Sequence, residues 1–76
     1  MNVLFVGGGR RVALARRFRA KGHRVYSYEL GYSVPIIREA SIIKGLKWDD
    51  PDIEDHFVKM VKKRNIDLII PLMDRA

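Results

Sequence analysis

A short apolar strand that ends in three consecutive glycines is the feature that most constrains the fold of this chain. The apolar run of residues 3–6 stops at Gly7, Gly8 and Gly9, and a basic segment that favours a helix begins at Arg10. This order predicts a buried parallel strand that passes through a tight turn into a helix. Glycine allows positive φ and a close approach of the backbone, and the N–H groups at a helix start attract anions. The turn is therefore either part of a binding site or only a structural corner.

The rest of the chain alternates between strand and helix patterns. Strands are predicted at residues 2–6, 24–30, 41–44 and 67–72, and helices at 10–21, 35–39 and 51–65. Gly22 is the expected stop of the first helix, and Asp50 is the expected N-cap of the last helix, with Pro51 in its first position. The third strand is expected at a sheet edge, whereas the unbroken apolar run of the fourth predicts burial on both of its faces.

The last helix carries the clearest amphipathic pattern. Its predicted core-facing stripe consists of Ile53, Phe57, Met60 and Val61, with the aliphatic part of Arg64 at its end. In the first helix, Ala15 and Phe18 are expected to face the core.

The order of the elements predicts an α/β fold, a Rossmann-like open parallel sheet with helices on both faces. Right-handed crossovers give the strand order 3-2-1-4, with the first two crossovers on one face and the helix of residues 51–65 on the other. One helix cannot cover a whole face, and another helix is expected after residue 76. We therefore expect residues 1–76 to form a single domain that is a fragment of a longer protein.

Composition excludes several kinds of stabilisation and site. The 76 residues include no cysteine and only two histidines, so thiolate metal sites and disulfides are excluded and no metal cluster is expected. No apolar run approaches the roughly 20 residues of a membrane span. We expect a cytoplasmic protein that has no membrane partner.

The net charge of +6 is unevenly distributed. Seven cations gather between residues 10 and 24, whereas acidic residues gather between residues 49 and 55. The basic segment is either a solvated helix face, which we favour, or a surface that binds phosphate or nucleic acid.

The glycine turn partly matches a dinucleotide-binding fingerprint. Gly7 and Gly9 occupy the first two glycine positions of that motif, Val12 replaces the third, and Glu29 lies 20 residues after Gly9, where an acid would bind a ribose hydroxyl. Arg10 puts bulk where a pyrophosphate would approach. A structural corner is the favoured interpretation, followed by a small-molecule or phosphate contact and then by a nicotinamide site.

Charged residues next to the turn are the other site candidates. Arg10 and Arg11 oppose the dipole of the first helix, which indicates either an anionic partner or solvated side chains. Glu29 and Asp74 each follow a strand, at the sheet edge where open α/β proteins bind ligands. With Gly8 and Gly9 they are candidates to line one crevice that holds a substrate amine or a ribose, although both acids are alternatively only strand-ending residues.

The two histidines and the aromatic residues do not form a catalytic motif. His23 and His56 lack a serine, cysteine or aspartate arranged for nucleophilic catalysis, and both are expected to be solvated. Packing is expected for Tyr26, Tyr28, Tyr32 and Trp48, rather than base stacking. No catalytic residue is predicted.

Four stretches of the chain resemble one enzyme family. The strand and glycine turn of residues 2–12, the segment 34–40, the helix start 50–52 and the stretch 66–74 are similar in order to the start of the ATP-grasp carboxylate–amine ligases, in the branch related to the carbamoyl phosphate synthase large subunit. The most specific parts are Gly-Gly-Gly-Arg-Arg-Val at 7–12 and Asp-Leu-Ile-Ile-Pro-Leu-Met-Asp at 67–74. The resemblance covers nearly the whole chain.

The resemblance implies a non-catalytic pre-ATP-grasp domain. Such a domain packs beside the ATP-grasp domain of the same parent chain and helps to form the acceptor-substrate side of the active site. By this resemblance, Gly8, Gly9 and Arg10 would border the cleft for a small-molecule substrate, with Glu29 and Asp74 nearby. ATP and magnesium would be bound by later domains of the parent enzyme, and no cofactor by this fragment.

Two alternatives stay open. One is a nucleotide-binding or regulatory module with the same fold. The other is a basic nucleic-acid-binding module, although nucleic acid is not the partner that we expect.

Overall fold

The computed structural model describes residues 1–8, 10–47 and 49–72. Strands and helices alternate along them, as the sequence predicts. In chain order they are β1 (Asn2–Val6), α1 (Val12–Ala20), β2 (Arg24–Glu29), the short 3-10 helix η1 (Pro35–Arg38), β3 (Ser41–Lys44), α2 (Ile53–Arg64) and β4 (Leu68–Pro71). No helix among these residues is both long and apolar enough to cross a membrane.

The four strands form one parallel sheet in the order β3-β2-β1-β4, which confirms the predicted fold class and strand order. Val3 of β1 lies opposite Val25 of β2 and opposite Leu68 of β4. Tyr28 of β2 lies opposite Ile43 of β3. The carboxyl ends of all four strands therefore meet at one edge of the sheet.

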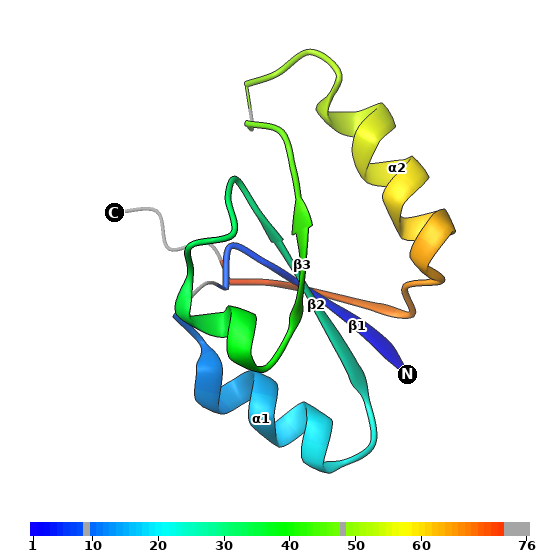
Figure 1. Cartoon of the computed structure of the whole chain (residues 1–76). Coiled ribbons are helices and arrows are strands. Elements are labelled where there is room, and N and C mark those ends of the chain that lie inside the picture. The colour runs from blue at the N-terminus through cyan, green and yellow to red at the C-terminus, as the bar shows by residue number, and fades with distance from the viewer. Residues whose placement is uncertain (9, 48, 73–76) are drawn as a thin grey trace.

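The helices cover opposite faces of the sheet, as Figure 1 shows. Alternate residues of each strand point to opposite faces, so the core has two layers. One layer packs Leu4, Val6, Tyr26, Tyr28 and Ile43 against Met60 of α2, and the other packs Val3, Phe5 and Val25 against Ala15 of α1 and Ile36 of η1. The first two crossovers thus lie on one face and α2 on the other, as predicted.

Helix α1 begins at Val12, two residues later than predicted. The Arg11 N–H donates to the Gly8 carbonyl oxygen at 2.8 Å, which holds the preceding residues in a turn rather than in the helix. Ala15 is fully buried, and the ring of Phe18 packs edge-on against Phe5 with centroids 5.7 Å apart. Helix α1 therefore packs against the sheet through the small side chain of Ala15 and the ring of Phe18.

Helix α2 begins at Ile53, so the prediction of Asp50 as its N-cap is wrong. The Asp50 carboxylate instead accepts the Asp52 N–H at 2.8 Å in the turn before the helix. The predicted apolar stripe is confirmed, since Met60 is buried and Ile53, Phe57 and Val61 pack around it. At the other end, the Asn2 side-chain amide donates to the Arg64 and Asn65 carbonyl oxygens, which ties the end of α2 to β1.

Strand β4 is not buried on both faces, so that prediction is wrong. Leu68 is 39% exposed and Ile69 is 41% exposed, and they point to opposite faces of the sheet. Within the described residues β4 pairs only with β1, so it forms one edge of the sheet, as β3 forms the other. The helices pack over the middle of the sheet and leave both faces of β4 partly uncovered.

Candidate functional site

The turn between β1 and α1 uses its glycines for two different reasons. Gly7 has φ +75°, a conformation that favours glycine. Gly8 is buried, and a Cβ there would lie 2.9 Å from the Leu72 Cδ1 atom and 3.2 Å from the Phe5 Cβ atom. Gly8 therefore allows the turn to pack closely against Phe5 and Leu72, whereas Gly7 provides the positive φ of the turn. Gly9 lies outside the described residues.

Arg10 and Arg11 are both exposed beside this turn. Neither forms an ion pair with an acid in the described part of the chain. The first turn of α1 contains no acidic residue, and no side-chain hydrogen bond caps it. Positive charge therefore accumulates at the amino end of α1, and no acid among the described residues forms an ion pair with it.

Glu29 ends β2 on the same face of the sheet as α1. Its Oε2 atom accepts a hydrogen bond of 2.7 Å from the Ser27 hydroxyl, and Ser27 is fully buried. A buried hydroxyl needs such a partner, because leaving it unpaired is costly. Ser27 thus fixes the orientation of the Glu29 carboxylate. No sequence motif singles out Ser27, although its position two residues before Glu29 on one strand places both side chains on one face.

These residues line a cleft at the carboxyl edge of the sheet. The cleft has two adjoining arms that share Gly7, Glu29, Ser33 and Val34. The charged arm, about 800 Å³, is completed by Arg10, Arg11, Pro35 and Leu72. The apolar arm, about 410 Å³, is completed by Tyr28, Leu30, Gly31, Tyr32 and Leu46.

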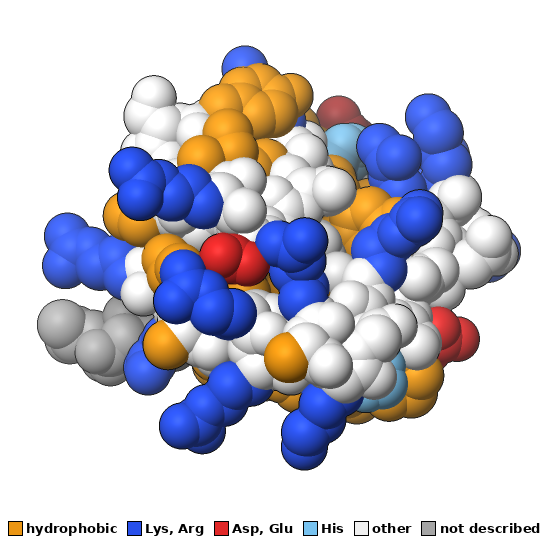
Figure 2. All heavy atoms as spheres, turned by 60° about the horizontal axis from the view of Figure 1, so that its bottom comes forward, with side chains coloured by type: hydrophobic (Ala, Val, Ile, Leu, Met, Phe, Trp, Pro, Cys, Tyr) orange, Lys and Arg blue, Asp and Glu red, His pale blue; other side chains and the backbone are white. Residues whose placement is uncertain are grey.

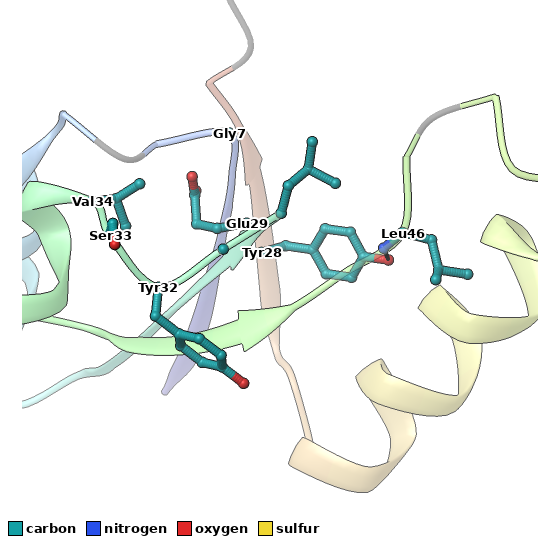
Figure 3. A pocket seen from close by; sticks show the side chains of 9 residues that line it. Gly7, Tyr28, Glu29, Tyr32, Ser33, Val34 and Leu46 are labelled. Atoms are coloured by element: carbon teal, nitrogen blue, oxygen red, sulfur yellow. Dashed lines mark hydrogen bonds between the residues drawn. The ribbon is translucent and has the colours of Figure 1, made fainter.

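Figure 3 shows the Glu29 carboxylate between the Gly7 turn and Val34, where the two arms meet. Open parallel sheets bind ligands at this edge, beside the point where the crossovers change direction. Here that point lies between β1 and β4, whose crossovers pass over opposite faces. Four predicted site residues (Gly7, Arg10, Arg11 and Glu29) therefore lie together at one cleft. Gly8 lies beneath it, and Asp74 is outside the described residues.

A second polar cluster lies under the apolar arm. The Tyr28 hydroxyl lies 2.8 Å from the His56 Nδ1 atom and accepts the Leu46 N–H at 3.0 Å. The rings of Tyr28 and His56 pack edge-on, 5.8 Å apart. The expectation of a solvated His56 is therefore wrong, because His56 joins α2 to the sheet through Tyr28.

The structure confirms some of the predictions for the other aromatic residues and contradicts one. Tyr26 and Tyr28 are buried, as predicted for packing residues, and His23 is half-buried beside Phe18. Tyr32 is 55% exposed at the rim of the cleft, so its prediction as a packing residue is wrong. Trp48 lies outside the described residues.

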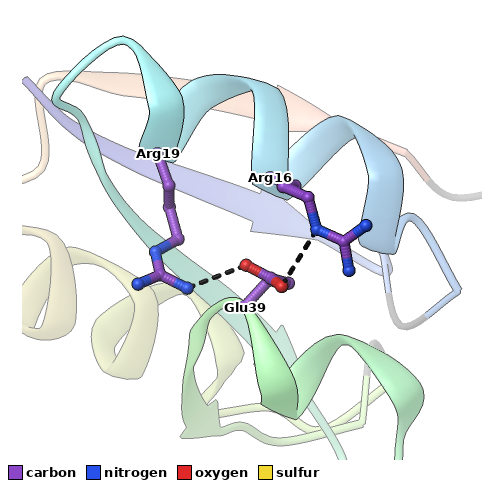
Figure 4. Close-up of polar contacts among 3 residues, drawn as sticks. All are labelled: Arg16, Arg19 and Glu39. Atoms are coloured by element: carbon purple, nitrogen blue, oxygen red, sulfur yellow. Dashed lines mark hydrogen bonds and ion pairs between the residues drawn. The ribbon is translucent and has the colours of Figure 1, made fainter.

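An ion-pair cluster supports the wall of the cleft. Glu39, which follows η1, accepts hydrogen bonds from Arg16 at 3.1 Å and from Arg19 at 2.8 Å (Figure 4). The hydrogen bond from Arg16, with the charges of both arginines, holds the pKa of Glu39 below its ordinary value of 4.5. This cluster joins η1 to α1, and Val34 and Pro35 at the start of η1 line the cleft.

The face of the molecule that carries α1 is strongly basic. Figure 2 shows lysine and arginine side chains over this face, with few acidic side chains between them. The exposed cations of this part of the chain are Arg10, Arg11, Arg16, Arg17, Arg19, Lys21, Arg24 and Arg38. The basic segment is thus exposed, and at its amino end it borders the cleft.

Among the described residues, no group of three or more histidine, aspartate or glutamate side chains is arranged to hold a metal ion. A comparison with models of protein families finds no match. A comparison with curated proteins finds no similar sequence.

Proposed function

We propose that this chain is the N-terminal, non-catalytic domain of an ATP-dependent ligase similar to carbamoyl phosphate synthase. In this proposal it forms the acceptor-substrate side of the active site. The observation that carries it is the cleft at the carboxyl edge of the sheet, which brings together the glycine turn, Glu29 and two arginines. Of the residues that the resemblance to ATP-grasp ligases names, Arg10 and Glu29 line this cleft.

The chemistry of the cleft supports a binding role rather than a catalytic one. Among its described lining residues, Glu29 is the only acid, and no histidine lines it. The side chains can therefore hold charged groups of a substrate but provide no nucleophile activated by a base. In the proposed enzyme, ATP and Mg²⁺ would be held by the later domains.

The uncovered strand β4 supports a partner domain from the same parent chain. Leu68 and Ile69 expose apolar surface on opposite faces of the sheet edge. An edge strand with exposed apolar residues is prone to aggregation unless another element covers it. A following ATP-grasp domain that packs against β4 would cover this surface, and the part of it that reaches the carboxyl ends of the strands would close the cleft.

The test compares ATP turnover by the purified 76-residue chain with turnover by the intact polypeptide in which the domain occurs. We expect no hydrolysis and no ligation by the chain alone, and ATP turnover by the intact polypeptide. Turnover by the chain alone would contradict a non-catalytic role. An intact polypeptide that folds but never consumes ATP, with any amine or carboxylate offered, would contradict the ligase.

A basic nucleic-acid-binding module is the second candidate, and the cationic face seen in Figure 2 favours it. Phosphate contacts release counterions, so such binding would weaken steeply as salt increases. Salt-sensitive binding of single-stranded or duplex nucleic acid, lost when Arg16 and Arg17 are replaced by glutamine, would support this candidate over the ligase domain.

A further inference from the structure

We infer that the cleft binds a small molecule that carries both an amino group and an anionic group, together with an apolar side chain. This inference rests on the proposed function, because it identifies the class of acceptor that the ligase domain would hold.

The charged arm provides the site for the anionic group. Arg10 and Arg11 both line it, and neither has an acidic partner among the described residues. Arginine binds carboxylate and phosphate through paired N–H donors. An anion in this arm would also lie near the amino end of α1, which has no acidic side chain in its first turn.

Glu29 provides the site for the amino group. Its carboxylate is half-buried and is oriented by the hydroxyl of fully buried Ser27, which engages one oxygen. The carboxylate lies where the two arms meet. An ionised carboxylate accepts hydrogen bonds only and is stabilised by a cation, and an ammonium group meets both requirements.

The separation of the two charge types indicates a dipolar ligand. Glu29 and the two arginines line the same arm, yet none of their charged atoms form an ion pair within 4.0 Å. The opposite charges of the cleft therefore do not neutralise each other directly. A molecule with an ammonium group and an anion at its two ends would contact both.

The apolar arm accounts for the third part of the ligand. It opens beside Glu29 and is lined by Leu30, Tyr32 and Leu46. Its volume of about 410 Å³ has room for an apolar or aromatic side chain. An amino group at Glu29, with the anion in one direction and a ring in the other, describes an aromatic or aliphatic amino acid. A phosphate-bearing amine shares the first two groups.

Matched probes test each group in turn. Binding of L-phenylalanine, 3-phenylpropionate, phenethylamine and O-phosphoethanolamine to the 76-residue chain is followed by amide chemical shifts. We expect L-phenylalanine to bind at least about tenfold more tightly than either analogue that lacks one charged group, since a charge-assisted hydrogen bond is lost in each. Tighter binding of O-phosphoethanolamine than of L-phenylalanine would identify the anion as a phosphate and would overturn the apolar part of the inference, because O-phosphoethanolamine carries no apolar side chain.

Variants assign the two charged groups to residues. Glu29→Gln should abolish the preference for L-phenylalanine over 3-phenylpropionate and leave most of the preference over phenethylamine. The pair Arg10→Gln and Arg11→Gln should have the opposite effect. Lys21→Gln, which removes one cation of the same segment away from the cleft, should change neither preference.

The inference is overturned if neither L-phenylalanine nor O-phosphoethanolamine binds. It is also overturned if Glu29→Gln keeps the full preference for L-phenylalanine over 3-phenylpropionate while its amide spectrum shows the native fold. Shifts confined to residues outside the cleft would overturn it as well. The proposed function is tested separately by ATP turnover of the intact polypeptide, so a cleft that rejects these probes leaves that measurement unaffected.

Discussion

Replacing Tyr28 by phenylalanine should destabilise the fold without changing its shape. The substitution removes only the hydroxyl, which lies 2.8 Å from the His56 Nδ1 atom and accepts the Leu46 N–H at 3.0 Å. The ring itself is 3% exposed and keeps its packing against Phe57, at 5.2 Å between centroids. The change therefore isolates the polar connection among β2, α2 and the loop after β3.

The size of the effect follows from these two hydrogen bonds. Each is worth about 0.5–1.5 kcal/mol net, and a partly buried N–H left without a partner adds to the cost. The expected loss is about 1–3 kcal/mol in the free energy of unfolding. For a domain of this size, 1 kcal/mol lowers Tm by about 4–8 °C, so Tm should fall by at least about 4 °C.

Tyr26→Phe is the matched control. Tyr26 lies on the same strand and the same face and is similarly buried at 7%, but its hydroxyl makes no hydrogen bond to another described residue. Chemical denaturation of both variants, followed by circular dichroism, measures the difference. Equal losses for Tyr26→Phe and Tyr28→Phe, or no loss for either, would refute the argument.

Three further changes test separate parts of the structure. Gly45→Ala would place a methyl group against the buried Tyr28 ring and should cost about 1–3 kcal/mol or more in thermal melts, whereas Gly31→Ala, which meets open space, should cost little. Glu39→Gln should lower stability at pH 7. Because the pKa of Glu39 is lowered in the folded state, its contribution to stability is complete above about pH 4.5. The difference in stability between Glu39→Gln and the parent should shrink as the pH falls through the lowered pKa of the folded state. A difference that grows in acid would contradict this. Replacing Ile69 by lysine should reduce self-association in sedimentation experiments without loss of folding, because a charge blocks an exposed edge strand; unchanged association would contradict this.

The order of elements and the sheet topology could be predicted from the sequence, because they follow from local signals such as glycines and changes in the hydrophobic pattern. Glycine after an apolar run identified the end of β1, and the handedness of crossovers then decided the strand order. Burial of β4 could not be predicted in the same way. The apolar run that includes Leu68 and Ile69 suits a central strand, but exposure depends on what packs beside it, which the pattern of the strand itself does not specify.

The sequence predicts those residues of the cleft whose position follows from the topology of the sheet. It does not predict the side-chain contacts that support them. Glu29 was identified because residues at the carboxyl ends of parallel strands share one edge. Ser27 orients Glu29 from two residues away on the same strand, so only the alternation of side chains along β2 points to it. His56 contacts Tyr28 from 28 residues away and carries no local signal, because the contact forms only when α2 packs on the sheet.

The central claim is that this domain is one part of an ATP-dependent ligase, and its most direct test is the identity of the intact polypeptide in which the domain occurs. Mass spectrometry of that polypeptide, with the sequence that it carries beyond residue 76, should reveal a glycine-rich ATP-grasp loop and paired metal-binding acids. A polypeptide that consists only of these 76 residues, or one whose further sequence lacks both features, would contradict the account.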